Sequence, residues 1–111
     1  MQKFINQIAD INWEVANHIG AKKKVIFSSN EFESNLTQVA YTQLVKNFEI
    51  PLHLHSTMEE VFFVIDGICE FNIQGKLLLA KKESTVLIPA NTEHSIKAIT
   101  NCNLLYFGIS I

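Results

Sequence analysis

Cysteine is scarce in this sequence, with only Cys69 and Cys102 among its 111 residues. Two cysteines are too few for a disulfide framework, and these two do not form the C-x-x-C pair of redox and zinc motifs. We therefore expect two reduced, partly buried thiols in a cytosolic protein.

The sequence also lacks a strong excess of either charge. Lys and Arg together number nine, against eleven Asp and Glu, which leaves a formal net charge of −2. Such a balance gives no electrostatic footprint for nucleic acid or for an anionic membrane, so we expect neither as a partner. The one basic run, Lys22-Lys23-Lys24, is interpreted as a solvated turn before a strand.

Long hydrophobic runs are missing as well. The first apolar residues are interrupted by Asn, Gln and Asp, so they do not form the apolar core of a secretory signal. The longest apolar stretches fall far short of a membrane span. We therefore expect a cytoplasmic location.

The sequence does contain a large apolar fraction, 48% of its residues, with eight Phe, two Tyr and one Trp. A chain of this length and composition folds as one domain around a single core. In residues 1–23, Phe4, Ile8 and Ile11 have the spacing of one or two helical turns. We predict a short irregular or helical cover segment at 1–23 and a β-barrel at 24–111.

From residue 24 onward, short segments rich in Val, Ile, Phe and Thr alternate with turn-like breaks. This pattern is typical of an antiparallel sandwich or barrel. The turns Asp66-Gly67 and Gln74-Gly75 are hairpin signals. The predicted strands lie at residues 24–29, 36–45, 60–65, 68–73, 76–80, 84–89, 94–99 and 103–111.

Two of these strands, at 60–65 and 76–80, are apolar on both faces, where a sheet with one solvated face would alternate. Their outer faces need a cover. We expect the N-terminal segment to supply part of it and a second subunit to supply the rest, which predicts a homodimer.

Titratable side chains are concentrated in the stretch PLHLHSTMEEVFFVIDG. Residues two apart in a strand share a face, so His53 and His55 point into the same space. Leu52 and Leu54 are expected to point the other way, into packing. Pro51 fits the start of this strand and not the interior of a central one.

Glu60 lies five residues beyond His55, and its carboxylate reaches the imidazoles if the two strands pair. His94 starts another strand, after a Pro-Ala-Asn turn. Three imidazoles and one carboxylate suit first-row divalent transition metals and not Ca²⁺ or Mg²⁺, which prefer oxygen ligands. The alternative is that each histidine is a core residue bonded to a backbone carbonyl.

These residues and spacings resemble the two motifs of the cupin family. The first, G-x5-H-x-H-x3-4-E-x6-G, is matched by Asn47, His53, His55, Glu60 and Gly67. The second, G-x5-P-x-G-x2-H-x3-N, is matched by Pro89 and His94, with Glu83, Asn91 and Ala98 at the other three positions.

Three of the departures from the motifs fall at glycine positions in turns. Asn tolerates the left-handed backbone of a turn glycine, so Asn47 and Asn91 are acceptable replacements. Glu83 is not, and we predict a different form for its turn.

The resemblance implies an all-β fold, a double-stranded β-helix or jelly roll of the small single-domain kind. It implies a divalent transition metal (Mn²⁺, Fe²⁺, Ni²⁺ or Zn²⁺) bound by His53, His55, Glu60 and His94. The motif spacing selects Glu60 over Glu59 and turns Phe62 and Val64 inward with it. His18 lies outside the motifs and is expected to be dispensable for metal.

The same fold serves dioxygenases, isomerases, lyases, decarboxylases and non-catalytic binders. The first hypothesis is a metal-dependent isomerase, lyase or dioxygenase, or a metal-and-ligand-binding domain, that takes a small anionic metabolite in the barrel. The alternatives are a non-catalytic ligand-binding or sensor protein with the same pocket, and a structural domain with a vestigial site. The helper side chains considered, whose roles the sequence leaves open, are Tyr41, Gln43, Lys46 and Tyr106.

Overall fold

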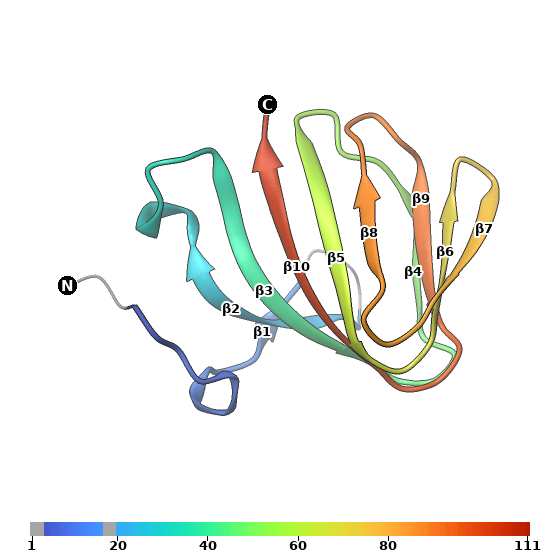
Figure 1. Ribbon diagram of the computed structural model, residues 1–111, viewed down its shortest axis with the longest axis horizontal. Coiled ribbons are helices and arrows are strands. Elements are labelled where there is room, and N and C mark those ends of the chain that lie inside the picture. Colours follow the sequence, from blue (N-terminus) through green and yellow to red (C-terminus); the bar gives the residue numbers. More distant parts are fainter. Residues whose placement is uncertain (1–3, 17–19) are drawn as a thin grey trace.

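The computed structural model describes residues 4–16 and 20–111, which form two antiparallel β-sheets that face each other (Figure 1). The larger sheet has six strands in the order β1-β2-β3-β10-β5-β8, and the smaller has four in the order β4-β9-β6-β7. This confirms the antiparallel β-sandwich that the strand pattern predicts and the jelly roll that the resemblance implies.

Every strand predicted from residue 24 onward is present, with ends that shift by a few residues. The strands are β1 Glu14–Val15, β2 Lys22–Ser28, β3 Leu36–Leu44, β4 Glu49–His53, β5 Met58–Asp66, β6 Cys69–Ile73, β7 Lys76–Ala80, β8 Thr85–Ile88, β9 His94–Ala98 and β10 Cys102–Ser110. Two 3₁₀ helices, η1 Ile8–Asp10 and η2 Ser29–Glu31, complete the elements. Over the described ranges, no helix has the length and apolar content that a membrane crossing requires.

The core lies between the two sheets and follows from alternation along each strand. In β5, Glu60, Phe62 and Val64 are buried and face the interior, as predicted, whereas Val61 and Phe63 are only partly buried. The apolar side chains that are almost fully buried include Phe71, Leu44, Ile88, Ile96 and Leu104. One side chain buried as deeply as these, His94, is polar.

The two predicted hairpins have different outcomes. Gln74-Gly75 joins the paired strands β6 and β7, with φ angles of 51° and 83° that suit a tight hairpin turn. The hairpin predicted at Asp66-Gly67 is wrong, because β5 and β6 belong to different sheets. The chain crosses from one sheet to the other at this turn.

Turns at three motif positions have a left-handed backbone. Asn47 and Asn91 have φ angles of 72° and 59°, as predicted for residues that replace glycine. Glu83 has a φ of 70°, so the prediction of a different turn form is wrong. Two backbone bonds hold this turn against β5, from Glu83 N to Val64 O at 2.8 Å and from Val64 N to Ser84 O at 2.9 Å. They compensate the strain of a non-glycine residue there.

The basic run at residues 22–24 is part of β2, so its interpretation as a solvated turn is wrong. Lys24 is buried on the outer face of the larger sheet, where its ammonium lies 4.9 Å from the ring centroid of Trp13. The same ammonium donates to the carbonyl oxygen of Ile8 at 2.9 Å. Trp13 also contacts Tyr41 of β3, with ring centroids 5.9 Å apart. The N-terminal segment that contains Ile8 and Trp13 therefore covers the outer face of β2 and β3.

The outer face of β7 is not covered by the described part of the chain. β7 is the last strand of the smaller sheet, and Leu77 and Leu79 on it are 60% and 71% exposed. Isolated exposed leucines are ordinary on protein surfaces, but two on one edge strand form an apolar stripe.

The two cysteines are free thiols, and both are buried more deeply than predicted. Cys102 Sγ donates to the carbonyl oxygen of Ile68 at 3.0 Å. Burial, and next the neighbouring Cys102 thiol, raise the pKa of the Cys69 thiol, which stays neutral and unreactive. The reducing compartment stays a prediction.

Substitution of Gly67 by alanine is expected to destabilise the fold by about 2–3 kcal/mol. The φ of Gly67 is +89°, and a Cβ atom there would overlap the backbone carbonyl oxygen of Asn101. Gly75→Ala is the matched control, because Gly75 has a similar φ of +83° but open space around it. It should lose only about 1 kcal/mol, from backbone strain alone. Urea unfolding measures both, and equal losses would contradict the role of the Asn101 contact.

Candidate metal centre

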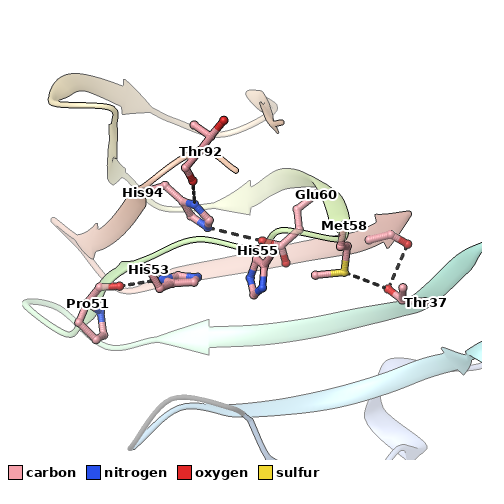
Figure 2. Close-up of polar contacts among 9 residues, drawn as sticks. Thr37, Pro51, His53, His55, Met58, Glu60, Thr92 and His94 are labelled. Atoms are coloured by element: carbon pink, nitrogen blue, oxygen red, sulfur yellow. Dashed lines mark hydrogen bonds and ion pairs between the residues drawn. The ribbon is translucent and has the colours of Figure 1, made fainter. Parts of the chain in front are cut away.

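The candidate metal centre consists of His53, His55, Glu60 and His94. Two of its imidazoles come from neighbouring strands of the smaller sheet. His53 is the last residue of β4 and His94 is the first of β9, and the antiparallel register pairs them directly. Their ring centroids lie 4.2 Å apart (Figure 2). His55 follows in the connection after β4, with its ring centroid 5.0 Å from that of His53.

Glu60 reaches these imidazoles from the opposite sheet. Its strand does not pair with the His53 strand, because β5 belongs to the larger sheet and β4 to the smaller. The Glu60 side chain faces the interior and crosses it, so that Oε1 lies 3.3 Å from His55 Nε2 and 3.5 Å from His94 Nε2. Glu59, its neighbour on the other face of β5, is not part of the cluster.

Backbone carbonyls fix the orientation of two rings. His53 Nδ1 lies 2.7 Å from the carbonyl oxygen of Pro51, and His94 Nδ1 lies 2.8 Å from that of Thr92. A carbonyl oxygen only accepts, so each Nδ1 carries the hydrogen and donates it. Each Nε2 therefore keeps a lone pair for the centre, which is the arrangement typical of metal-binding histidines.

The leucines beside these histidines do not supply the packing that we predicted. Leu52 and Leu54 are 55% and 47% exposed. Pro51 does not start the strand either, because β4 begins at Glu49. The smaller sheet has β4 at its edge, a position that accepts a residue without an N–H group.

Together the four side chains fit a metal ion. One ligand atom from each of His53, His55, Glu60 and His94 lies within 4.8 Å of the others. Within the described chain, the buried atoms Glu60 Oε1 and His94 Nε2 form no hydrogen bond, although they face each other at 3.5 Å. A cation bound by both would compensate these buried polar atoms better than that long contact does. The group is thus placed to hold a metal.

The environment of His94 raises its pKa above the usual value of 6.5. Burial lowers this pKa, but the contact with the Glu60 carboxylate, the bond to the Thr92 carbonyl and the charge of Glu60 together outweigh burial. The Glu60 carboxylate therefore favours the protonated form of the His94 imidazole.

A cavity of about 90 Å³ lies beside the centre, lined in part by His53, His55 and Glu60. Apolar side chains such as Phe62 and Leu104 form one part of its wall. The polar part consists of Lys23, Gln38, Thr42 and Tyr106. The sequence interpretation missed Lys23 because residues 22–24 were assigned to a turn, whereas alternation along a strand places this lysine on the opposite face from Lys22 and Lys24.

Of the four helper side chains considered, Tyr106 lines the cavity and the other three do not. Tyr41 lies against Trp13 on the outer face of the larger sheet, and its hydroxyl oxygen accepts a bond from Gln43 Nε2 at 3.0 Å. Lys46 is exposed beyond the end of β3. His18 lies outside the described residues.

Tyr106 provides a neutral hydroxyl group in the cavity. Burial, followed by the carboxylates of Glu60 and Glu14, raises the pKa of Tyr106 to about 12. Its ring stacks on Phe62 with centroids 5.4 Å apart, which fixes the ring plane. The hydroxyl group therefore stays protonated near neutral pH and can donate a hydrogen bond to a bound molecule.

Comparisons with known proteins agree with this geometry. Residues 40–108 match the sequence profile of the Cupin domain family. An uncharacterized protein of Methanocaldococcus jannaschii is 34% identical over 53 residues, which are 48% of this chain and 42% of that relative. The match thus spans less than half of the relative's length.

Two solved structures are similar over almost the whole chain. A predicted oxalate decarboxylase from Thermotoga maritima has a TM-score of 0.89 at 19% identity, covering 97% of this chain and 100% of the other. The polyketide cyclase RemF from Streptomyces resistomycificus has a TM-score of 0.80 at 17% identity, covering 99% and 80%. At these identities the likeness shows the shared fold.

Glu60→Gln is expected to lower the pKa of His94 in the metal-free protein, because it removes the carboxylate and leaves burial dominant. An NMR titration of the histidine Hε1 signals measures this. In the wild type, the raised pKa contributes stability that is fully present below pH 6.5 and is lost as the pH rises through the folded-state pKa.

The control for this experiment is Glu59→Gln, which changes the same charge outside the cluster and should leave the pKa of His94 unchanged. A wild-type pKa at or below 6.5 would contradict the interpretation. An equal fall in the pKa of His94 in Glu60→Gln and Glu59→Gln would also contradict it.

Proposed function

The chain belongs to the cupin family, and on that premise we propose that it binds Mn²⁺, Fe²⁺, Ni²⁺ or Zn²⁺ and, with it, a small anionic metabolite in the barrel. The ligands are His53, His55, Glu60 and His94. The observation that carries this proposal is the convergence of four ligand atoms, one from each of these side chains, within 4.8 Å of one another.

The donor set determines which ions suit the site. Three imidazole nitrogens and one carboxylate oxygen favour first-row transition metals over Ca²⁺ and Mg²⁺. A divalent ion and one carboxylate leave a net charge of +1, which attracts an anionic ligand. Four protein ligands leave two positions on a six-coordinate ion, enough for one chelating anion.

The bound metal would supply Lewis-acid polarisation of a carbonyl group or, as iron, activation of oxygen. The protein side chains have separate roles. Phe62 and Leu104 exclude water from the cavity, and the Tyr106 hydroxyl donates a hydrogen bond to the bound molecule. Isomerase, lyase and dioxygenase reactions are the classes that such a site would support.

A second candidate function, ligand binding or sensing without turnover, is favoured by one observation. Among the described cavity residues, the only titratable side chains besides the histidine and glutamate ligands are Lys23 and Tyr106. Neither is a carboxylate or imidazole of the kind that usually serves as general acid and base near neutral pH. Recovery of the bound metabolite unchanged after incubation with the metal-loaded protein distinguishes this function from catalysis.

Metal should stabilise the protein strongly. At a metal concentration about 100 times the Kd, linkage predicts a rise in Tm of about 10–20 °C for a domain of this size. His53→Ala, Glu60→Gln and His94→Ala should each abolish most of that rise, while circular dichroism shows an intact β fold. Differential scanning fluorimetry of apo protein with each metal measures the effect.

Two variants serve as controls for the metal experiment. Glu59→Gln and His18→Ala should keep the full rise in Tm. The rise should fade as the pH falls below about 6, because protons then compete with the metal for the histidines. Equal stabilisation of the wild type and His53→Ala would refute the site.

We also propose that the chain forms a homodimer that covers the apolar stripe on β7. The support is the exposure of Leu77 and Leu79 on the last strand of the smaller sheet. Burial of such side chains between two copies stabilises a dimer in proportion to the apolar area removed from water.

Sedimentation equilibrium at micromolar concentration should return the dimer mass for the wild type and the monomer mass for Leu79→Lys. A lysine on β7 would place a charge within the buried interface and discourage edge pairing. Val45→Lys changes a side chain that is 65% exposed outside β7, and it should remain a dimer. A monomeric wild type would refute the proposal.

A further inference from the structure

A flexible apolar side chain, Met58, forms the cavity wall next to the metal centre. Met58 is the first residue of β5, and because it lies two positions before Glu60 it faces the interior with it. Along β5 the cavity lining begins at Met58 and continues through Glu60 and Phe62. Figure 2 shows Met58 beside Glu60, with its sulfur directed toward Thr37 of β3. Met58 thus limits the cavity at one end of this series.

Gly108 of β10 provides the space that Met58 fills. It pairs with Glu60 on one side and with Gln38 on the other, so it lies between them in one row of the larger sheet. A Cβ atom at Gly108 would overlap the Met58 sulfur and lie 3.0 Å from its Cγ. A glycine within a strand often marks the close approach of another group. Here that group is the Met58 thioether.

Thr37 holds the Met58 side chain in this position. The register between β3 and β10 shifts at Thr37, which is the extra residue of a β-bulge. Its hydroxyl oxygen lies 3.1 Å from the carbonyl oxygen of Gly108 and 3.5 Å from Met58 Sδ, and its single hydrogen can be donated to either acceptor. Bulges re-aim side chains, and this bulge brings the Thr37 hydroxyl group to the thioether.

Next to Glu60, a bound molecule therefore meets a thioether and not a charged group. Gln38 lies on the other side of Gly108, where its Oε1 atom accepts a hydrogen bond from Lys23 Nζ at 3.0 Å. The Met58 side chain fills the space over Gly108, between this polar pair and Glu60. A thioether is apolar and polarisable, so this part of the wall suits an apolar group.

The size of the cavity depends on the same side chain. A volume of about 90 Å³ is well below the ~300–1000 Å³ of pockets that hold drug-sized molecules. Truncation of Met58 to alanine removes Cγ, Sδ and Cε, and Gly108 behind them has no side chain to take their place. The cavity would then extend from Glu60 to the backbone of β10.

We propose that Met58, held by Thr37 over Gly108, is the specificity-determining residue of the site. It admits ligands whose part beyond the metal-binding group is short and apolar, and it excludes longer ones. The inference rests on the proposed metal function, because the metal fixes the other end of the ligand.

Isothermal titration calorimetry of the Zn²⁺-loaded protein with two hydroxamates tests the proposal. Acetohydroxamate and hexanohydroxamate share the metal-binding group and differ only in a methyl or a pentyl chain. Burial of apolar area alone would favour the longer chain. The wild type should instead bind acetohydroxamate about tenfold or more tightly than hexanohydroxamate. Met58→Ala should bind hexanohydroxamate at least as tightly as acetohydroxamate.

Two variants serve as controls for the length limit. Met58→Leu keeps a side chain of similar volume and should keep the preference for acetohydroxamate. Ile109→Ala shortens an apolar side chain next to Gly108 that is 37% exposed and does not line the cavity, and it should also keep the preference. If Met58→Ala does not fold, Met58→Val shortens the same side chain and should show the same loss of preference.

Equal affinities for the two hydroxamates in the wild type would overturn the proposal, as would a preference for acetohydroxamate that survives in the shortened Met58 variants. Titration of the metal-free proteins with Zn²⁺ separates this result from the metal function. Equal Zn²⁺ affinity in the wild type and Met58→Ala, with no length preference in the wild type, would refute the role of Met58 and leave the metal site intact. Absence of Zn²⁺ binding to the wild type would refute both.

Discussion

The approach of the Glu60 carboxylate to the imidazoles of His55 and His94 is the constraint on which the architecture depends. Most of the buried side chains are apolar, but at this point the buried atoms are polar and each needs a partner. Glu60 belongs to one sheet and His94 to the other, so neither sheet can compensate its own polar residue. The two sheets must meet here at a fixed spacing, and the cavity is the space that remains beside this contact.

Local patterns in the sequence predicted the strands, because alternation depends only on neighbouring positions, whereas the grouping of the four clustered residues was implied by the resemblance to the two cupin motifs. The inward direction of Phe62 and the left-handed backbone of Asn47 followed from the same local rules. The pairing partner of each strand could not be predicted from these local rules. β5 follows β4 closely in the chain but pairs with β10 and β8, because pairing depends on which faces need to be buried together. The hairpin predicted at Gly67 failed for the same reason.

Burial of individual side chains was the other property that the sequence could not predict. Lys24 is buried under Trp13, whereas Leu52 and Leu54 beside the metal centre are largely exposed. Hydrophobicity alone would predict an exposed Lys24 and buried leucines. Burial depends instead on whether another segment covers that face of the sheet. The segment that covers Lys24 lies about ten residues earlier in the chain. The inward position of Lys23 depends on the same strand register and was missed with it.

Pro51 has a second consequence besides holding the ring of His53 through its carbonyl oxygen. It lies in the middle of β4, the strand at one edge of the smaller sheet, where the register with β9 is also irregular between Ile50 and His53. A proline has no amide hydrogen, so it interrupts the donors that an edge strand offers to a foreign chain. The strand that carries a metal ligand is therefore a poor template for strand addition, and intermolecular aggregation is disfavoured at the edge nearest the site.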